Sequence, residues 1–242
     1  MWFIYWILVG AILGSFTNML AWRLPKQEPW VYSRSYCPKC RHQLATLDLI
    51  PIVSYVALGG KCRYCHEPIS PRYFIVELTS AALWGCVPLI NNVFGLRYTI
   101  AWCLFVFFGL LASTIDWEHR EIPSALLDIL LVGTGVLCWF NWRQALFLGC
   151  IWGLFYLLSP FVLGKQGMGD GDVWFALTVG FILMPNEIMT SAIYMFTTGV
   201  VGILFSIIYA VITHNKLDKL EVPFLPAMWV AAIVIILIQL IY

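Results

Sequence analysis

The sequence predicts an all-α polytopic membrane protein with about eight transmembrane helices and a small cytoplasmic zinc-binding loop domain. Of its 242 residues 61% are hydrophobic and only 11% are charged, against about 25% charged in a typical soluble domain. The apolar runs are long enough to cross a bilayer, which takes about 20 residues per helix. The longest polar stretch holds two C-x2-C pairs, which is the usual ligand spacing of a structural zinc site.

Apolar runs bounded by Asn, Gly and Pro predict the individual helices. We expect them near residues 2–22, 73–91, 98–116, 123–140, 143–163, 172–185, 188–213 and 223–241. The first run carries no basic residue ahead of it and no small-residue cleavage site, so we interpret it as a retained helix and not as a signal peptide. The expected organisation is a first transmembrane helix (1–22), a cytoplasmic loop domain (23–72) and a seven-helix membrane domain (73–242).

The basic residues predict the orientation of these helices. With the N-terminus outside, twelve of the 14 Lys and Arg residues fall in cytoplasmic loops, and only Arg97 and Arg143 fall outside. This bias is the positive-inside pattern, so we expect both termini outside and residues 23–72 in the cytoplasm. The net charge is +1 and the basic residues are scattered, so no basic face for nucleic acid is predicted.

The cysteine pairs predict a metal site in the cytoplasmic loop. Cys37 and Cys40 are followed, after 21 intervening residues, by Cys62 and Cys65. Four thiolates close a tetrahedral zinc site and leave no position for catalysis, and metal binding would supply folding free energy that so small a loop lacks. Two disulfides are the alternative, but a reducing cytoplasm disfavours them. The neighbours His42 and His66 could replace a cysteine, although four cysteines already suffice.

Two acids are predicted to share one depth at the cytoplasmic ends of helices. Asp116 ends the run 98–116, and Asp172 ends the motif Gly167-Met168-Gly169-Asp170-Gly171-Asp172, 56 positions later. Acids within membrane segments are functional candidates because burying their charge is costly. Two neighbouring carboxylates share a proton, so one can act as general acid while the other activates water. This arrangement suits peptide-bond hydrolysis without a covalent intermediate.

The glycine motif leaves a second pairing open. Asp170 could partner Asp172, but residues two apart do not share a helix face, and we expect Asp170 to be a solvated loop residue. The motif glycines would permit an irregular turn and the close approach of a substrate backbone; they are Gly167, Gly169 and Gly171.

The remaining acids have simpler interpretations. Asp128 lies near the start of a predicted helix, where the helix dipole stabilises an acid. Glu77 could pair with Arg72 or Arg23. The G-x-S-x-G, H-E-x-x-H and Walker motifs are absent from the sequence, so serine peptidase, zinc peptidase and NTPase functions lack their residues.

With these residues in hand, the sequence resembles the type IV prepilin peptidases. The resemblance rests on several motifs in order along the chain: Gly14-Ser15-Phe16-Thr17-Asn18 running to Arg23-Leu24-Pro25, the two C-x2-C pairs with Asp48-Leu49-Ile50-Pro51 between them, Asp116 with Ile122-Pro123, Gly169-Asp170-Gly171-Asp172, and Val222-Pro223-Phe224. Two positions differ from the usual pattern: Asp170 stands at the x of G-x-G-D, and Glu118 stands where a second Asp is frequent.

The resemblance implies a fold, an activity and a location. It implies an intramembrane aspartic endopeptidase of the bacterial cytoplasmic (inner) membrane, with Asp116 and Asp172 as the catalytic pair. Its substrates would be prepilins and pseudopilins, which lose a short basic leader and often gain an N-methyl group from S-adenosylmethionine. Two other classes stay open: an ion- or proton-coupled transporter and a non-catalytic assembly factor of a pilus or secretion system. The lipid bilayer is a partner in each case.

Overall fold

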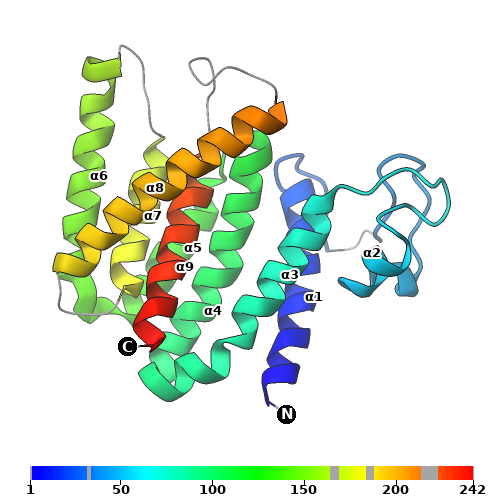
Figure 1. Cartoon of the computed structure of the whole chain (residues 1–242), viewed down its shortest axis with the longest axis horizontal. Coiled ribbons are helices and arrows are strands. Elements are labelled where there is room, and N and C mark those ends of the chain that lie inside the picture. Colours follow the sequence, from blue (N-terminus) through cyan, green and yellow to red (C-terminus); the bar gives the residue numbers. More distant parts are fainter. Residues whose placement is uncertain (1, 32–33, 164–168, 184–187, 214–222, 242) are drawn as a thin grey trace. The chain divides into compact units, whose positions relative to one another are not determined.

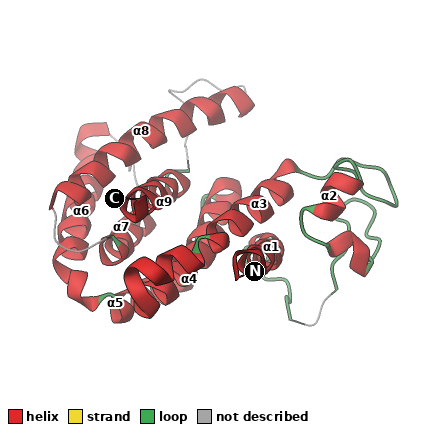
Figure 2. Ribbon diagram, turned by 60° about the horizontal axis from the view of Figure 1, so that its bottom comes forward, coloured by secondary structure: helices red, strands yellow, loops and turns green. Residues whose placement is uncertain are grey.

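The computed structural model describes residues 2–31, 34–163, 169–183, 188–213 and 223–241. Within these ranges helices dominate, and the extended structure consists of two isolated β-bridges (Figures 1 and 2). The elements in chain order are α1 (Trp2–Arg23), η1 (Thr46–Leu49), α2 (Val53–Ala57), α3 (Pro71–Gly85), α4 (Val87–His119), α5 (Ser124–Leu137), η2 (Trp139–Asn141), α6 (Trp142–Leu163), α7 (Asp170–Ile182), α8 (Ile188–Thr213) and α9 (Leu225–Ile241). They form two compact units, Met1–Asn92 (unit 1) and Val93–Tyr242 (unit 2).

In unit 1, helices α1 and α3 pack at very short range because α1 presents glycines to α3. A Cβ atom on Gly10 would lie 2.6 Å from the Cβ of Trp84 and 2.7 Å from the carbonyl of Ser80. The Ser80 hydroxyl donates a 2.7 Å hydrogen bond to the Gly10 carbonyl. Small residues and interhelical hydrogen bonds are how helices associate where lipid removes the hydrophobic driving force.

In unit 2, helix α7 is the short central element. Its Gly180 faces α6 so closely that a Cβ there would run into the backbone of Ala145. On the opposite side the ring of Phe175 stacks on Phe105 of α4, with centroids 5.8 Å apart. The side chain of Asn141 then closes the far end of α7 by donating to the carbonyls of Phe181 and Leu183, both at 2.8 Å.

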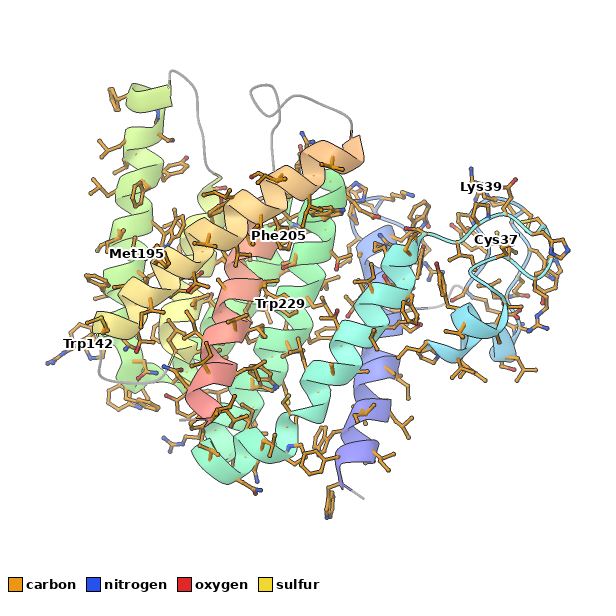
Figure 3. The ribbon with its side chains drawn as sticks, viewed as in Figure 1. Cys37, Lys39, Trp142, Met195, Phe205 and Trp229 are labelled. Carbon is orange, nitrogen blue, oxygen red and sulfur yellow. The ribbon has the colours of Figure 1, made fainter. Side chains whose placement is uncertain are left out.

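Helix α9 is buried along most of its length, and it packs against α4. Its Trp229, labelled in Figure 3, lies on this helix. A Cβ on Gly109 of α4 would collide with the indole ring of Trp229. The Trp229 Nε1–H donates to the carbonyl of Phe105 at 3.3 Å. An indole that is buried and hydrogen-bonded satisfies both its apolar body and its polar atom.

Four described helices are long and apolar enough to cross a membrane: Trp2–Arg23, Val87–His119, Trp139–Phe161 and Met189–Tyr209. Ser124–Leu137 and Leu225–Ile241 are apolar but shorter. Helix α7 has only 13 residues, well below the roughly 20 that a span perpendicular to the bilayer requires. The membrane character of the chain is therefore clear, whereas the count of eight spans stays a prediction.

The predicted break between the helices 73–91 and 98–116 was partly wrong. The expected helix 73–91 is interrupted at Cys86, and α4 then continues through Asn91 and Asn92, where a break was predicted. The predicted break at Gly95 is confirmed, because this residue leaves helical geometry with φ 78° and ψ 179°. A single glycine can absorb this turn because it has no Cβ, so the chain kinks without forming a loop.

The glycine contacts predict opposite effects of the same substitution at two helical positions. Gly180→Ala should lower the free energy of unfolding by about 1–3 kcal/mol, because overpacking forces the α6 backbone away. Gly199→Ala should be neutral or slightly stabilising, because nothing lies within 4 Å of its Cβ position and Ala favours a helix over Gly by up to about 1 kcal/mol. Thermal unfolding of both variants in detergent measures the difference. Equal shifts would contradict the proposed close packing of α7 on α6.

Candidate active site and metal centre

The two cysteine pairs of unit 1 adopt the same backbone fold. In each pair the N–H of the first cysteine donates to the carbonyl of the residue five positions later. The carbonyl of the same cysteine accepts the N–H of the residue four positions later. In the first turn these residues are Cys37, Arg41 and His42. In the second turn they are Cys62, His66 and Glu67. Arg41 and His66 both have φ 60°, and the bridges Tyr36–Gln43 and Lys61–Pro68 flank the two turns at the same offset. Sequence reasoning missed this local repeat, although the spacing of the pairs was its signal.

The four cysteine sulfurs meet in one place. The Sγ atoms of Cys37, Cys40, Cys62 and Cys65 lie within 4.8 Å of one another, and Cys37 and Cys65 approach to 4.0 Å. Ligands about 2.3 Å from a tetrahedral zinc ion lie roughly 3.8 Å apart, so this cluster needs only a small contraction to hold zinc. His42 is not required as a ligand, and its ring lies on the ring of Tyr64 with centroids 3.7 Å apart.

The backbone of the second cysteine turn also favours the thiolate form of Cys62. Burial opposes ionisation of Cys62, but the backbone N–H groups of Cys65 and Tyr64 point at its sulfur and lower the pKa of the thiol to about 7. Zinc binds the deprotonated form, so this backbone arrangement helps the Cys62 thiolate to act as a ligand.

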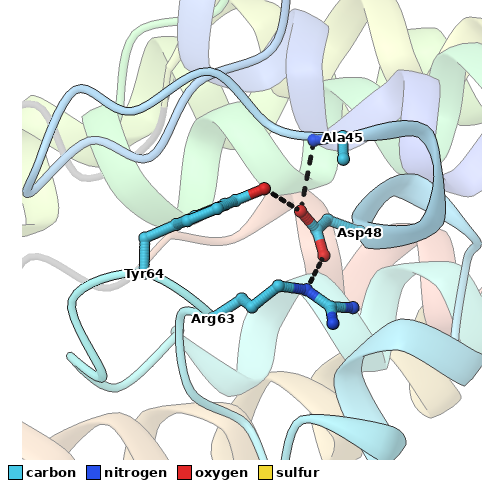
Figure 4. Close-up of polar contacts among 4 residues, drawn as sticks. All are labelled: Ala45, Asp48, Arg63 and Tyr64. Carbon is cyan, nitrogen blue, oxygen red and sulfur yellow. Dashed lines mark hydrogen bonds and ion pairs between the residues drawn. The ribbon is translucent and has the colours of Figure 1, made fainter.

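Asp48 fastens the second cysteine turn to the rest of the loop (Figure 4). Its side chain is 3% exposed and accepts from the Arg63 Nε at 2.6 Å, the Tyr64 hydroxyl at 3.1 Å and the Ala45 N–H at 3.1 Å. Burial alone would raise the pKa of Asp48, but these donors outweigh burial and lower the pKa. Arg63 and Tyr64 are the two residues between Cys62 and Cys65, so η1 is tied directly to the metal-binding turn.

Glu77 of α3 makes a second stabilising contact with the same loop, at Ile52. The sequence suggested Arg72 or Arg23 as its partner, but its Oε2 accepts from the Ile52 N–H at 2.7 Å instead. Ile52 has φ 64° and ψ −53°, and the Val53 N–H reaches back to the Pro51 carbonyl at 2.6 Å. This is a γ-turn with positive φ, which is a strained conformation for a β-branched residue. The Glu77 carboxylate therefore stabilises a turn that the chain would otherwise avoid.

Unit 2 carries the first of the two predicted acids at the end of α4. Asp116 lies in the last turn of that helix, and the residue is only 8% exposed. Its Oδ2 accepts the N–H of Leu225 at 3.2 Å. Leu225 is the first residue of α9 and is fully buried. First-turn N–H groups have no partner within their own helix, so Asp116 satisfies a donor that would otherwise be buried and unpaired.

Asp172 lies in the first turn of α7 and accepts the N–H of Gly169, the N-cap residue, at 3.2 Å. The carboxyl end of α4 and the amino ends of α7 and α9 lie at the same end of unit 2 (Figure 1). The carboxylates of Asp116 and Asp172 are close enough for their charges to interact. The structure thus brings together two acids that are 56 positions apart, beside two helix N-termini whose partial positive charge favours anions.

The other residues of the glycine motif lie around Asp172. Asp170 is exposed and accepts the N–H of Gly171 at 2.9 Å, and its charge also reaches Asp172. Gly169 has an ordinary φ of −77°, so its backbone conformation does not itself require glycine. A Cβ on Gly171 would lie 3.3 Å from Leu127 of α5, so this glycine provides close packing. Gly167 lies outside the described residues.

Comparison with known proteins adds independent information to this geometry. Residues 8–90 match the model of the bacterial peptidase A24 N-terminal domain, and residues 103–207 match the type IV leader peptidase family. A prepilin leader peptidase/N-methyltransferase of Pseudomonas aeruginosa is 33% identical over 81% of this chain and 79% of its own length. The chain belongs to the type IV leader peptidase family.

Other members cover the chain nearly end to end. A prepilin leader peptidase/N-methyltransferase of Bacillus subtilis is 31% identical over 90% of this chain and 87% of its own length. A type 4 prepilin-like proteins leader peptide-processing enzyme of Escherichia coli is 28% identical over 96% and 93%. No solved structure matches. The resemblance predicted from the motifs is confirmed.

The sulfur cluster predicts a metal dependence that one substitution can test. Cys40→Ser removes one of four ligands, so the zinc content of the purified protein should fall and the loop should be cut faster in limited proteolysis, because metal binding and loop folding are coupled. Elemental analysis and a proteolysis time course measure both. Cys150→Ser on α6, an exposed cysteine outside the cluster, is the matched control. Full zinc occupancy in Cys40→Ser would contradict the four-cysteine site.

Proposed function

We propose that this protein is an aspartic endopeptidase that removes the leader peptide of type IV prepilins and pseudopilins, with Asp116 and Asp172 as its catalytic pair. The supporting observation is that these two carboxylates, which interact through their charges, each accept an N–H at the start of a helix at one end of unit 2. The names of the relatives supply the substrate class, since those proteins are called prepilin leader peptidases.

The mechanism follows from two carboxylates that share one proton. The ionised carboxylate takes a proton from a water molecule, and the water oxygen attacks the carbonyl carbon of the leader bond. The protonated carboxylate donates its proton to the leaving nitrogen as the C–N bond breaks. The N–H groups of Leu225 and Gly169 hold the two carboxylates in place during both transfers. No covalent intermediate with the protein is needed.

The proposed membrane arrangement keeps the orientation given by the basic residues. Both termini lie outside, and the loop domain (23–72) and the Asp pair lie at the cytoplasmic side of the inner membrane. The membrane domain (73–242) includes the shorter helices among about eight embedded segments. The short α7 supports this proposal, because a 13-residue helix leaves part of the membrane thickness for the apolar helix of a substrate.

Zinc, in this proposal, is structural. Cys37, Cys40, Cys62 and Cys65 would occupy all four tetrahedral positions, so the ion has no open position at which to activate water. Its contribution is to fold a loop that is too small to build its own hydrophobic core.

The relatives' names also support a second activity, N-methylation of the new N-terminus with S-adenosylmethionine. This cofactor would supply an electrophilic methyl group. Within the described residues we identify no set of side chains built for its adenosine group, and no step proposed here depends on it.

Removal of either acid should abolish cleavage. Asp116→Asn and Asp172→Asn should each lower the cleavage rate of a co-expressed prepilin by about 100-fold or more, because general acid–base catalysis contributes on that scale. An asparagine oxygen can still accept the Leu225 or Gly169 N–H, so folding should be kept. Mass spectrometry of the pilin N-terminus measures processing.

Asp170→Asn is the matched control, because it removes a neighbouring carboxylate that makes its own local hydrogen bond. This variant should keep most of the activity. Thermal unfolding in detergent at the wild-type temperature by all three variants would show that the fold is intact. Full processing by Asp116→Asn or Asp172→Asn would refute the catalytic pair.

Methylation can be tested on the same product. Incubation of the wild-type protein with a prepilin and labelled S-adenosylmethionine should transfer label to the processed chain, because the new N-terminal amine is the nucleophile. Asp172→Asn should transfer none, since no new amine forms. A processed but unlabelled product would refute the second activity while leaving the peptidase proposal intact.

A further inference from the structure

Three polar side chains of unit 1 lie together between α1 and α3. Ser15 and Asn18 are one turn apart on α1, and Glu77 lies one turn from Tyr73 on α3. Asn18 is 1% exposed and Glu77 is 8% exposed. The antiparallel packing places Asn18 beside Tyr73 and Ser15 beside Glu77. The oxygens of these side chains therefore gather in one buried stretch of the interface.

Asn18 has a carboxamide oxygen with no hydrogen-bond donor among the described residues. Its Nδ2 donates to the Tyr73 carbonyl at 3.0 Å, which fixes the orientation of the carboxamide. Its Oδ1 is buried, and no donor among the described residues reaches it. A buried carbonyl oxygen without a donor is unfavourable, so it points to a missing partner.

Glu77 accepts hydrogen bonds but lacks a counter-charge. Its carboxylate receives the Ile52 N–H and the Ser15 hydroxyl, and no cation in the described part of the chain pairs with it. The nearby Arg23 donates to the carbonyls of Pro29 and Arg34, and the guanidinium of Arg72 lies over the ring of Tyr73. Buried charges in proteins are nearly always paired, so the missing partner should be positive.

The chemistry of the missing partner follows from these acceptors. A partner must offer N–H donors to one carboxylate and one amide oxygen, and it must carry a positive charge. A primary ammonium group has three N–H donors around one compact charge and fits both demands. A guanidinium is planar and larger, and it would need a wider opening between helices that touch at Gly14, where a Cβ would lie 2.8 Å from the Cα of Glu77.

We propose that Glu77 and Asn18 bind a primary ammonium group of the pilin substrate. This inference rests on the proposed function for its source of ammonium. That function provides two sources: a lysine side chain in the basic leader, and the N-terminal amine that cleavage creates. Both present the same chemistry to the site.

Glu77 also supports the γ-turn at Ile52, and a test must separate that structural role from binding. Glu77→Gln does so, because the glutamine oxygen can still accept the Ile52 N–H while the charge is lost. Ser80→Ala is the matched control. Ser80 is equally buried in the α1–α3 interface, where it donates to the Gly10 carbonyl, and it carries no charge.

The experiment measures peptide binding to the full-length protein in detergent by fluorescence anisotropy. One pair of labelled peptides is a leader with its lysines and the same leader with glutamines. A second pair is a mature pilin N-terminus with a free amine and its N-acetylated form. None of these peptides contains the scissile bond, so binding is independent of cleavage. Cleavage of intact prepilin by the same preparations is measured separately and reports on the proposed function alone.

We expect wild type to bind the charged member of one pair about tenfold more tightly, as a charge-assisted hydrogen bond allows. Glu77→Gln should remove that preference, and Ser80→Ala should keep it. The pair that responds identifies the source of the ammonium. Equal binding of both members of both pairs by wild type, or a preference kept by Glu77→Gln, would overturn the proposal. If Glu77→Gln fails to fold, as judged by zinc content, Asn18→Ala provides the same comparison.

Discussion

Contacts between two carboxylates and the first turns of two helices fix one end of unit 2. In water a free N–H at a helix start costs little, but in an apolar interior it must find an acceptor. Asp116 provides that acceptor for α9, where Leu225 is fully buried and the next residue, Pro226, has no N–H to share. Asp172 accepts from the exposed N–H of Gly169, the N-cap residue of α7. The proposed catalytic acids are thus also structural caps, which explains how two costly groups persist near each other.

The loop of unit 1 is held by polar and metal-binding groups in place of a hydrophobic core. Asp48 ties η1 to the residues between Cys62 and Cys65, and Glu77 ties the strained turn at Ile52 to α3. Asp48 is the first residue of the segment 48–52, and Glu77 accepts the N–H of its last residue, Ile52, so this short segment connects the metal-binding turn to α3. A loop of about fifty residues cannot be stabilised by apolar burial alone. Local, directional contacts are the available alternative.

Glycine has two different uses in this chain. At Gly95 it permits a backbone conformation that other residues rarely adopt. At Gly10, Gly109 and Gly180 the backbone is ordinary helix, and the missing side chain creates space for a neighbouring helix or indole ring. The second use gives the interhelical contact that lipid cannot provide through the hydrophobic effect. It also lets α7 remain central despite its short length.

The sequence by itself determined the class of the protein and its family, and it predicts four cysteines as metal ligands. Composition, the C-x2-C spacing and the order of the motifs are local properties, so they can be read without a structure. From helix alternation and the basic residues, the sequence also predicts that Asp116 and Asp172 lie at one depth. The charges of the two carboxylates interact in the structure, and their catalytic pairing stays a prediction. Tertiary structure decided what each polar group contacts: Leu225 for Asp116, Ile52 for Glu77, and Arg63 with Tyr64 for Asp48. Such partners are distant in the chain and depend on helix rotation, which hydrophobic periodicity cannot fix when lipid-facing and buried surfaces are both apolar.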